Sequence, residues 1–139
     1  MLVIENEESL SKLKECTPYH FNAPLAILIC YDSSVSWKRH YDKKDMGDVD
    51  SSIVTTQMML EIANLGLGTT WVGHFSLELI KEKFNLPEYL VPVALLPIGY
   101  PSEDSVPNKL HNIRHDIQET VFFNSFEGIK PGKNKTTDH

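Results

Sequence analysis

Several common protein classes are excluded by what this sequence lacks. It contains only two cysteines, Cys16 and Cys30, without Cys-x-x-Cys spacing, which indicates ordinary thiols in a reducing compartment. It has no Gly-x-Ser-x-Gly motif, so a Ser-His-Asp hydrolase built on that nucleophile turn is not indicated. The apolar run over residues 25–30 is far too short to cross a membrane, because a spanning helix needs about 20 residues. The 41% hydrophobic content therefore indicates a globular protein.

Clustered positive charge is also scarce. The 13 Lys and Arg stand against 19 Asp and Glu, a net charge of −6, which argues against nucleic acid because phosphate affinity needs clustered cations. The basic stretches over residues 38–44 and 130–135 are broken by acids, prolines or glycines and are typical of solvated loops and tails. Glu5, Glu7 and Glu8 stand where a signal peptide would need basic and apolar segments, so we expect a cytoplasmic protein.

The length of 139 residues fits one small domain. We predict that residues 1–126 form it and that residues 127–139, which have almost no apolar side chain, form a mobile polar tail. The apolar run Leu25–Tyr31 is typical of a central strand covered on both faces. A second buried strand is expected over Val91–Ile98, with its two prolines confined to the strand ends. The polar loop over residues 32–48 is long enough to be functional or mobile.

Three helices are expected around these strands. The first lies within residues 5–15, with Leu10 and Leu13 facing inward. The second begins near Asp50, capped by Asp48 or Asp50, and ends near Leu65. The third is capped by Ser76, and its inward-facing residues are Leu77, Ile80 and Phe84.

The segment Asn64–Phe75 is the most informative part of the sequence. Gly66 is placed where a helix needs a left-handed residue, and Gly68 allows a tight reversal into a strand over residues 69–72. Gly73 has no side chain, so a planar ligand could approach its backbone closely. The alternative is that all three glycines only shape turns.

In order along the chain, this segment and its neighbours resemble the nitroreductase family of FMN-dependent oxidoreductases over roughly residues 23–123. The matching residues are Gln57, Ala63, Leu65–Gly68, Trp71–Phe75, Leu86, Pro87 and Pro92–Pro101. Family members open with helices that carry a basic cluster for the FMN phosphate, whereas this chain starts at a segment resembling the strand after those helices. The resemblance implies an N-terminally shortened α+β fold, with a central mixed or antiparallel sheet flanked by helices.

The resemblance also implies the chemistry and the site. Family members transfer a hydride from NAD(P)H through FMN to a nitroaromatic, quinone or similar small acceptor, so no catalytic acid, base or nucleophile is required of the protein. The segment made of Trp71, Val72, Gly73 and His74 would lie against the isoalloxazine ring, and Arg114 would bind the phosphate. The alternative for Arg114 is a solvated loop residue, and Lys109 is a further candidate for phosphate charge.

A metal site is not expected. His111 and His115 stand four apart beside Asp116, but Pro107 and the intervening residues make a helix there doubtful. A structural or catalytic metal site also needs three or four convergent ligands.

Assembly is the last expectation. The helix over residues 50–65 is apolar on more than one stripe, which fits either burial inside one chain or a homodimer interface. The resemblance favours the homodimer, with the flavin between protomers. Residues 120–124 are rich in β-branched and aromatic side chains, so we expect them to pair with a sheet. The resemblance implies that they cross to the sheet edge of the partner. The competing function is a flavin-free remnant that keeps the fold as a binding or structural protein without turnover.

Overall fold

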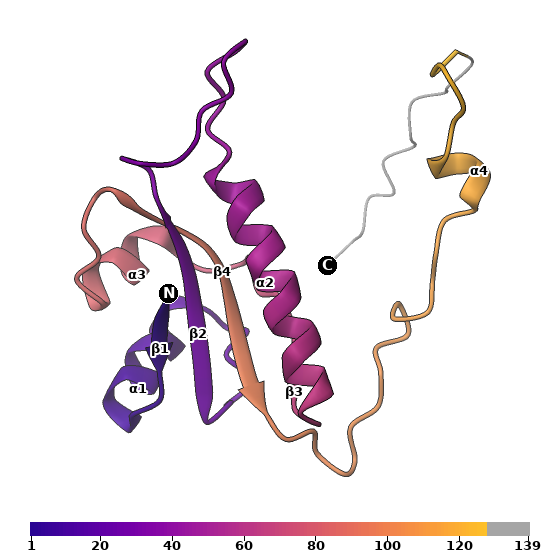
Figure 1. Ribbon diagram of the computed structural model, residues 1–139. Helices are drawn as coiled ribbons and strands as arrows, with labels where there is room; N and C mark the ends of the chain where they lie inside the picture. Colours follow the sequence, from indigo (N-terminus) through magenta and orange to yellow (C-terminus); the bar gives the residue numbers. More distant parts are fainter. Residues whose placement is uncertain (128–139) are drawn as a thin grey trace. The chain divides into compact units, whose positions relative to one another are not determined.

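The computed structural model describes residues 1–127, which fall into two compact units that are treated separately, residues 1–103 and the described residues from 104 onward. The first unit contains a four-stranded antiparallel sheet with the strand order β1-β2-β4-β3. Its elements are β1 (Leu2–Ile4), α1 (Glu7–Cys16), β2 (Leu25–Asp32), α2 (Gly47–Asn64), β3 (Gly68–Thr69), α3 (Leu77–Lys83) and β4 (Leu90–Gly99). The predicted α+β class with a helix-flanked sheet is confirmed, and its described strand pairs are all antiparallel (Figure 1).

Helices cover both faces of the sheet. On one face, α1 and α3 contribute Leu13 and Ile80 to a core cluster that also contains Leu28 and Leu95. On the other face, Ile62 of α2 packs with a second cluster that includes Leu96. Leu95 and Leu96 are adjacent yet both fully buried, because successive strand residues point to opposite faces. This two-sided cover explains why β2 and β4 are almost continuously apolar, as predicted.

The two prolines of β4 lie inside the strand rather than at its ends, so that prediction is wrong. Pro92 pairs with Cys30 where the register shifts, and the bulge there tolerates a missing N–H. Pro97 pairs with Ala26, and its carbonyl accepts a hydrogen bond from Thr69 Oγ1 at 2.8 Å. Since the carbonyl and nitrogen of a strand residue face the same side, the proline nitrogen faces β3 and leaves the pairing with β2 intact.

The missing N–H of Pro97 explains why the predicted strand over residues 69–72 is interrupted. Thr69 pairs with Ile98, and Val72 pairs with Leu95, so the same register places Thr70 opposite Pro97. A proline there cannot donate to the ladder. The strand is therefore reduced to Gly68–Thr69 and a separate bridge at Val72.

The helix predictions are confirmed in outline and corrected in detail. The helix α2 starts at Gly47, after an N-cap residue Met46 that makes no side-chain cap, so Asp48 and Asp50 lie in the first turn instead of capping it. Gly66 has φ +76°, which confirms the left-handed position after α2. Gly68, predicted to allow a tight reversal into a strand, has no positive φ and is itself the first residue of β3.

The shorter helices show one further correction. Ser76 caps α3 by accepting a hydrogen bond from the Leu79 amide at 3.2 Å, as predicted. Leu77, however, is exposed, and the half-buried Leu79 packs against the core in its place. In α1 the predicted inward residue Leu13 is buried, and Leu10 is partly buried against the same cluster.

The second unit is described here over residues 104–127. It contains one helical turn, α4 (Ile117–Thr120), whose N-cap Asp116 accepts from the Gln118 amide at 2.9 Å. The part of the chain from residue 104 to 127 contains no strand, and residues 120–124 pair with no strand among residues 1–127. The predicted mobile tail lies almost entirely outside the described residues, and the single domain over residues 1–126 stays a prediction.

Candidate functional site

The segment Trp71–Phe75 is anchored to β4 at one residue. The Val72 amide donates to the Leu95 carbonyl at 3.0 Å, and the Leu95 amide donates to the Val72 carbonyl at 2.9 Å. The Val72 side chain is buried in the core cluster shared by α1 and α3. Val72 therefore has a structural role. The Trp71 carbonyl and the Gly73 N–H share peptides with the bonded groups of Val72, so both point away from Leu95.

The backbone that follows Val72 presents unused hydrogen-bond donors. The N–H of Gly73 belongs to the same trans peptide as the Val72 carbonyl, so it points away from Leu95. Within residues 1–127, no protein group accepts a hydrogen bond from the amides of Gly73, His74 or Phe75. Three consecutive free amides can serve a ligand that presents acceptor atoms along one edge.

Gly73 leaves room for such a ligand. A Cβ placed on Gly73 would meet only the indole Nε1 of Trp71, at 3.8 Å, which is ordinary contact. No positive φ requires glycine at this position. Folding therefore does not require glycine at this position, and the space over its backbone is open to a ligand.

The far end of the segment is tied to the end of α1. Thr17 Oγ1 donates to the His74 carbonyl at 2.6 Å, and the Ser76 amide donates to the Cys16 carbonyl at 2.9 Å. The backbone that carries these amides is therefore held by two contacts. The Val72 carbonyl is bonded to Leu95 of β4, and the His74 carbonyl is bonded to Thr17, which follows α1.

An aromatic row beside His74 was missed from the sequence. The Tyr19 ring lies edge-on to the His74 ring with centroids 5.5 Å apart, and the Phe21 ring lies 6.3 Å from Tyr19. Both Tyr19 and Phe21 are exposed. The row extends the surface of Trp71–Phe75 with flat, apolar rings.

The backbone that holds Phe21 is strained. The Ala23 amide donates to the His20 carbonyl at 3.1 Å, and the two residues between, Phe21 and Asn22, have φ values of 53° and 50°. A bulky L-residue in this left-handed region costs about 1–2 kcal/mol. Turn positions with positive φ favour Asn, Asp or Gly, so an aromatic residue there is the feature of the sequence that could have pointed to this row.

Arg114 belongs to the second unit. Its Nη1 donates to the carbonyls of His111 and Ile113 at 2.8 and 2.9 Å, and the side chain is exposed. Lys109 is also exposed. Trp71–His74 therefore form one continuous segment of the first unit, and Arg114 is an exposed residue of the second unit.

One histidine of the second unit, His115, contacts a carboxylate. His115 Nδ1 lies 3.1 Å from Glu119 Oε2, one helical turn away. In residues 1–127 no group of three or more His, Cys, Asp or Glu is placed to hold a metal ion. Burial raises the pKa of the Cys16 and Cys30 thiols, which disfavours their thiolate forms.

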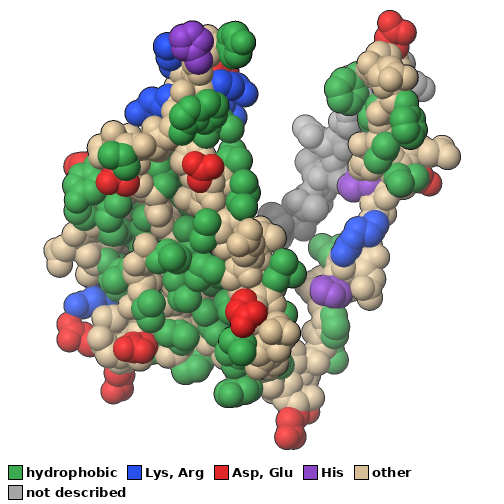
Figure 2. Space-filling view, in the orientation of Figure 1, with side chains coloured by type: hydrophobic (Ala, Val, Ile, Leu, Met, Phe, Trp, Pro, Cys, Tyr) green, Lys and Arg blue, Asp and Glu red, His purple; other side chains and the backbone are tan. Residues whose placement is uncertain are grey.

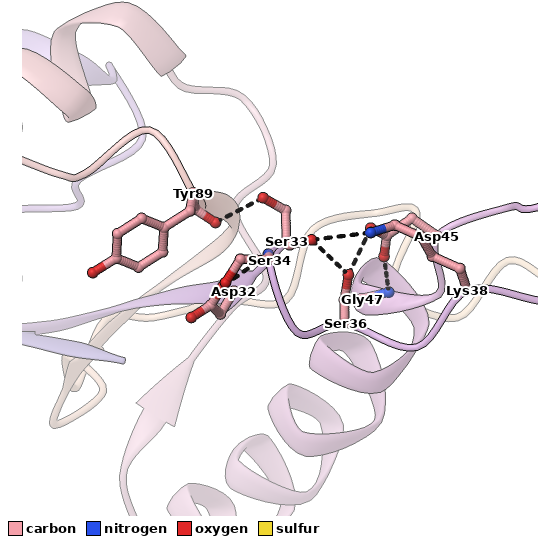
Figure 3. A network of polar contacts seen from close by, with 8 residues as sticks. All are labelled: Asp32, Ser33, Ser34, Ser36, Lys38, Asp45, Gly47 and Tyr89. Carbon is pink, nitrogen blue, oxygen red and sulfur yellow. Dashed lines mark hydrogen bonds and ion pairs between the residues drawn. The ribbon is translucent and has the colours of Figure 1, made fainter.

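The loop between β2 and α2 has a polar base and an exposed tip. At its base, Asp45 accepts from Ser36 Oγ at 2.6 Å and from the Gly47 amide at 2.9 Å, and Lys38 lies 3.9 Å away (Figure 3). The Ser36 hydroxyl, the Gly47 amide and Lys38 hold the pKa of Asp45 below its ordinary value. Lys, Arg and His side chains gather at the tip (Figure 2).

Comparison with known proteins identifies the family and the fold. A sequence profile of the nitroreductase family matches residues 4–100. The chain belongs to the nitroreductase family. A crystal structure of a nitroreductase family protein from Clostridium difficile 630 matches with a TM-score of 0.81 and 38% identity, over 89% of this chain and 72% of that one.

Two further relatives show the range of the nitroreductase match. An FMN-dependent nitroreductase from Clostridium difficile R20291 matches with a TM-score of 0.68 and 26% identity, over 90% of this chain and 74% of that one. A Methanothermobacter thermautotrophicus protein named "Putative NADH dehydrogenase/NAD(P)H nitroreductase" is 34% identical in an alignment 115 residues long, which covers 74% of this chain and 55% of the relative. This chain thus spans little more than half of that curated relative.

No helix among the described residues is both long and apolar enough to cross a membrane.

Proposed function

We propose that this chain carries the flavin-binding part of an FMN-dependent oxidoreductase, which passes electrons from NADH or NADPH to a nitroaromatic, quinone or similar small acceptor. The observation that supports this most is the run of free amides at Gly73, His74 and Phe75 beside a glycine whose missing side chain folding does not require. Membership of the nitroreductase family supplies the cofactor class. We expect the protein to act in the cytoplasm.

The residues of the first unit fit the ring of FMN. The isoalloxazine carries nitrogen and oxygen acceptors along one edge, and the amides from Gly73 to Phe75 are donors with no acceptor among residues 1–127. Trp71, exposed over 36% of its surface, and the Tyr19 ring would give the flat system apolar contact. When bound, FMN supplies hydride transfer at its N5 atom, while the protein supplies binding and polarity.

The phosphate end is assigned to the second unit. Arg114 is exposed and uses only Nη1 for its two backbone contacts, so the rest of its planar guanidinium can face a phosphate. Lys109 is a second exposed cation on the same segment. We assign the phosphate to Arg114, with Lys109 as an added charge.

We further propose that the active form is a homodimer. Four large apolar residues of α2 are exposed, Val49, Ile53, Val54 and Leu60. Helical geometry places Val49, Ile53 and Leu60 opposite the buried Thr55 and Ile62. A helix that is apolar on the face turned from its own sheet needs a second cover. In the second unit, residues 120–124 would pair with the partner's sheet edge, and the short outer strand β1, which carries the exposed Val3, offers such an edge.

An absorption spectrum tests the cofactor and separates the two functional classes. The purified 139-residue chain is incubated with FMN, passed through gel filtration and scanned in the visible range. A flavin spectrum that travels with the protein supports the oxidoreductase. A protein that remains colourless with added FMN would instead support the flavin-free binding or structural protein.

A further inference from the structure

The Thr17 side chain connects three parts of the first unit through one hydroxyl. Thr17 follows α1 and is only 2% exposed. Its Oγ1 donates to the His74 carbonyl at 2.6 Å and accepts from the Tyr19 amide at 3.1 Å. Both hydrogen-bonding functions of the hydroxyl are therefore used, and the bond to His74 joins residues 57 positions apart.

The bond to His74 also orients the free amides. Because the His74 carbonyl points toward Thr17, the Phe75 N–H of the same trans peptide points away from it. At the other end, the Val72 carbonyl is held by Leu95, which turns the Gly73 N–H away from the sheet. The amides from Gly73 to Phe75 are thus held at two peptides, Val72–Gly73 and His74–Phe75, and Thr17 holds the second.

The second bond of Thr17 acts on the aromatic row. The Tyr19 amide is bound to Oγ1, and the Tyr19 ring lies against the His74 ring. One hydroxyl therefore sets both the amide donors and the position of Tyr19 beside them.

The other buried threonine is a useful contrast. Thr55 is fully buried in α2, but its Oγ1 donates to the Ser51 carbonyl at 2.7 Å, one turn back in the same helix. That bond is local and fixes nothing outside the helix. The two residues share chemistry and burial and differ in what their hydroxyls connect.

We infer that Thr17 is a positioning residue of the proposed FMN site, which holds the Gly73–Phe75 amides and the Tyr19 ring in one arrangement through its hydroxyl. The inference rests on the proposed function, because it assigns those amides to the flavin. Thr17 itself does not touch the flavin in this proposal.

The test uses the full chain with three substitutions, Thr17→Val, Thr17→Ser and Thr55→Val, and measures FMN affinity by fluorescence titration together with the visible spectrum of bound flavin. Thr17→Val keeps the shape and removes both hydrogen bonds, so FMN affinity should fall about tenfold, equivalent to about 1.4 kcal/mol. Thr17→Ser restores the hydroxyl and should return the affinity to within about threefold of wild type and restore the wild-type flavin spectrum. Thr55→Val also removes a buried hydroxyl, and it should leave FMN affinity unchanged.

A second measurement covers the case in which Thr17→Val does not fold. Hydrogen–deuterium exchange of the wild-type chain is followed at the Tyr19 amide, with and without FMN. If binding requires the Thr17 contacts, FMN should slow exchange at Tyr19 as well as at Gly73–Phe75, because a ligand suppresses openings of the state that it binds.

The outcomes separate the two proposals. A wild-type chain that takes up no FMN would overturn the proposed function and this inference with it. Equal FMN affinity in wild type, Thr17→Val and Thr17→Ser would leave the cofactor site standing and overturn the role of Thr17. Slowed exchange at Gly73–Phe75 without any change at Tyr19 would overturn it as well.

Discussion

The two units of this chain treat their apolar residues in opposite ways. In the first unit, strands and helices bury apolar side chains from Ile4 to Ile98 in two clusters, one on each face of the sheet. In the second, the large apolar residues are exposed, namely Val106, Leu110, Ile113, Ile117, Val121, Phe122, Phe123 and Phe126. The first unit has a core of its own. The apolar residues within 104–127 lack one, so they need another surface to cover them. A second copy of the chain is the surface that we propose.

The largest expected effect comes from opening the core of the first unit. Leu95→Ala removes a fully buried side chain and should lower the free energy of unfolding by about 3 kcal/mol. Phe123→Ala, in the second unit, should change it by less than about 0.5 kcal/mol when measured by denaturant at a concentration where the protein is monomeric. Equal losses for the two variants would mean that residues 104–127 are packed within one chain, which would contradict the contrast between the two units.

The next effect concerns residues 119–127. Deleting residues 119–139 should weaken the dimer strongly, because it removes the segment proposed to pair with the partner's sheet. Deleting only residues 128–139 should leave the dimer intact. Sedimentation of both truncated chains measures this. If they associate alike, residues 120–124 do not pair with the partner's sheet.

A smaller effect is expected on the outer face of α2. Ile53 and Leu77 are exposed over 55% and 52% of their surfaces, so they form a matched pair on two helices. Ile53→Glu should raise the dimer dissociation constant by at least about tenfold, equivalent to about 1.4 kcal/mol, because it places a charge in the proposed interface. Leu77→Glu should leave the dissociation constant unchanged. Sedimentation equilibrium gives both constants, and a shift in the Leu77 variant alone would place the interface on α3.

The smallest effect concerns Asp45 at the base of the loop after β2. Its pKa is lowered in the folded protein, so it stabilises the fold above its unfolded pKa of about 3.9 and stops doing so as pH falls through the folded value. Asp45→Asn should therefore lower Tm at pH 7, and this difference from wild type should vanish in acid. Asp104→Asn, an exposed residue of the second unit, serves as the charge-matched control. A Tm difference that persists at the lowest pH would show that charge is not the cause.

The features that the sequence predicted well depend on local chemistry. Ser76 as a helix cap and Gly66 as the left-handed residue after α2 are set by their nearest neighbours, and both are confirmed. The assignment of Trp71–His74 to the flavin ring stays a prediction.

The features that were missed depend on residues far apart in the sequence. The interruption at Thr70 requires knowing that Pro97 lies opposite, which only the register of β4 reveals. The link between Thr17 and His74, and the aromatic row beside it, likewise arise because α1 ends against that segment. Leu77 was placed inward because helical spacing alone does not show which side of a short helix the core lies on.

The most direct test of the account is an FMN titration of wild type, Gly73→Ala and Gly73→Val, with Tm measured for each. A Cβ on Gly73 meets nothing closer than Trp71 Nε1 at 3.8 Å, so neither variant should lose its fold. The account predicts that Gly73→Val loses FMN binding, with Gly73→Ala between it and wild type, because the added carbons occupy the space in front of the free amides. Unchanged FMN affinity in a folded Gly73→Val protein would contradict the placement of the flavin ring against Trp71–Phe75.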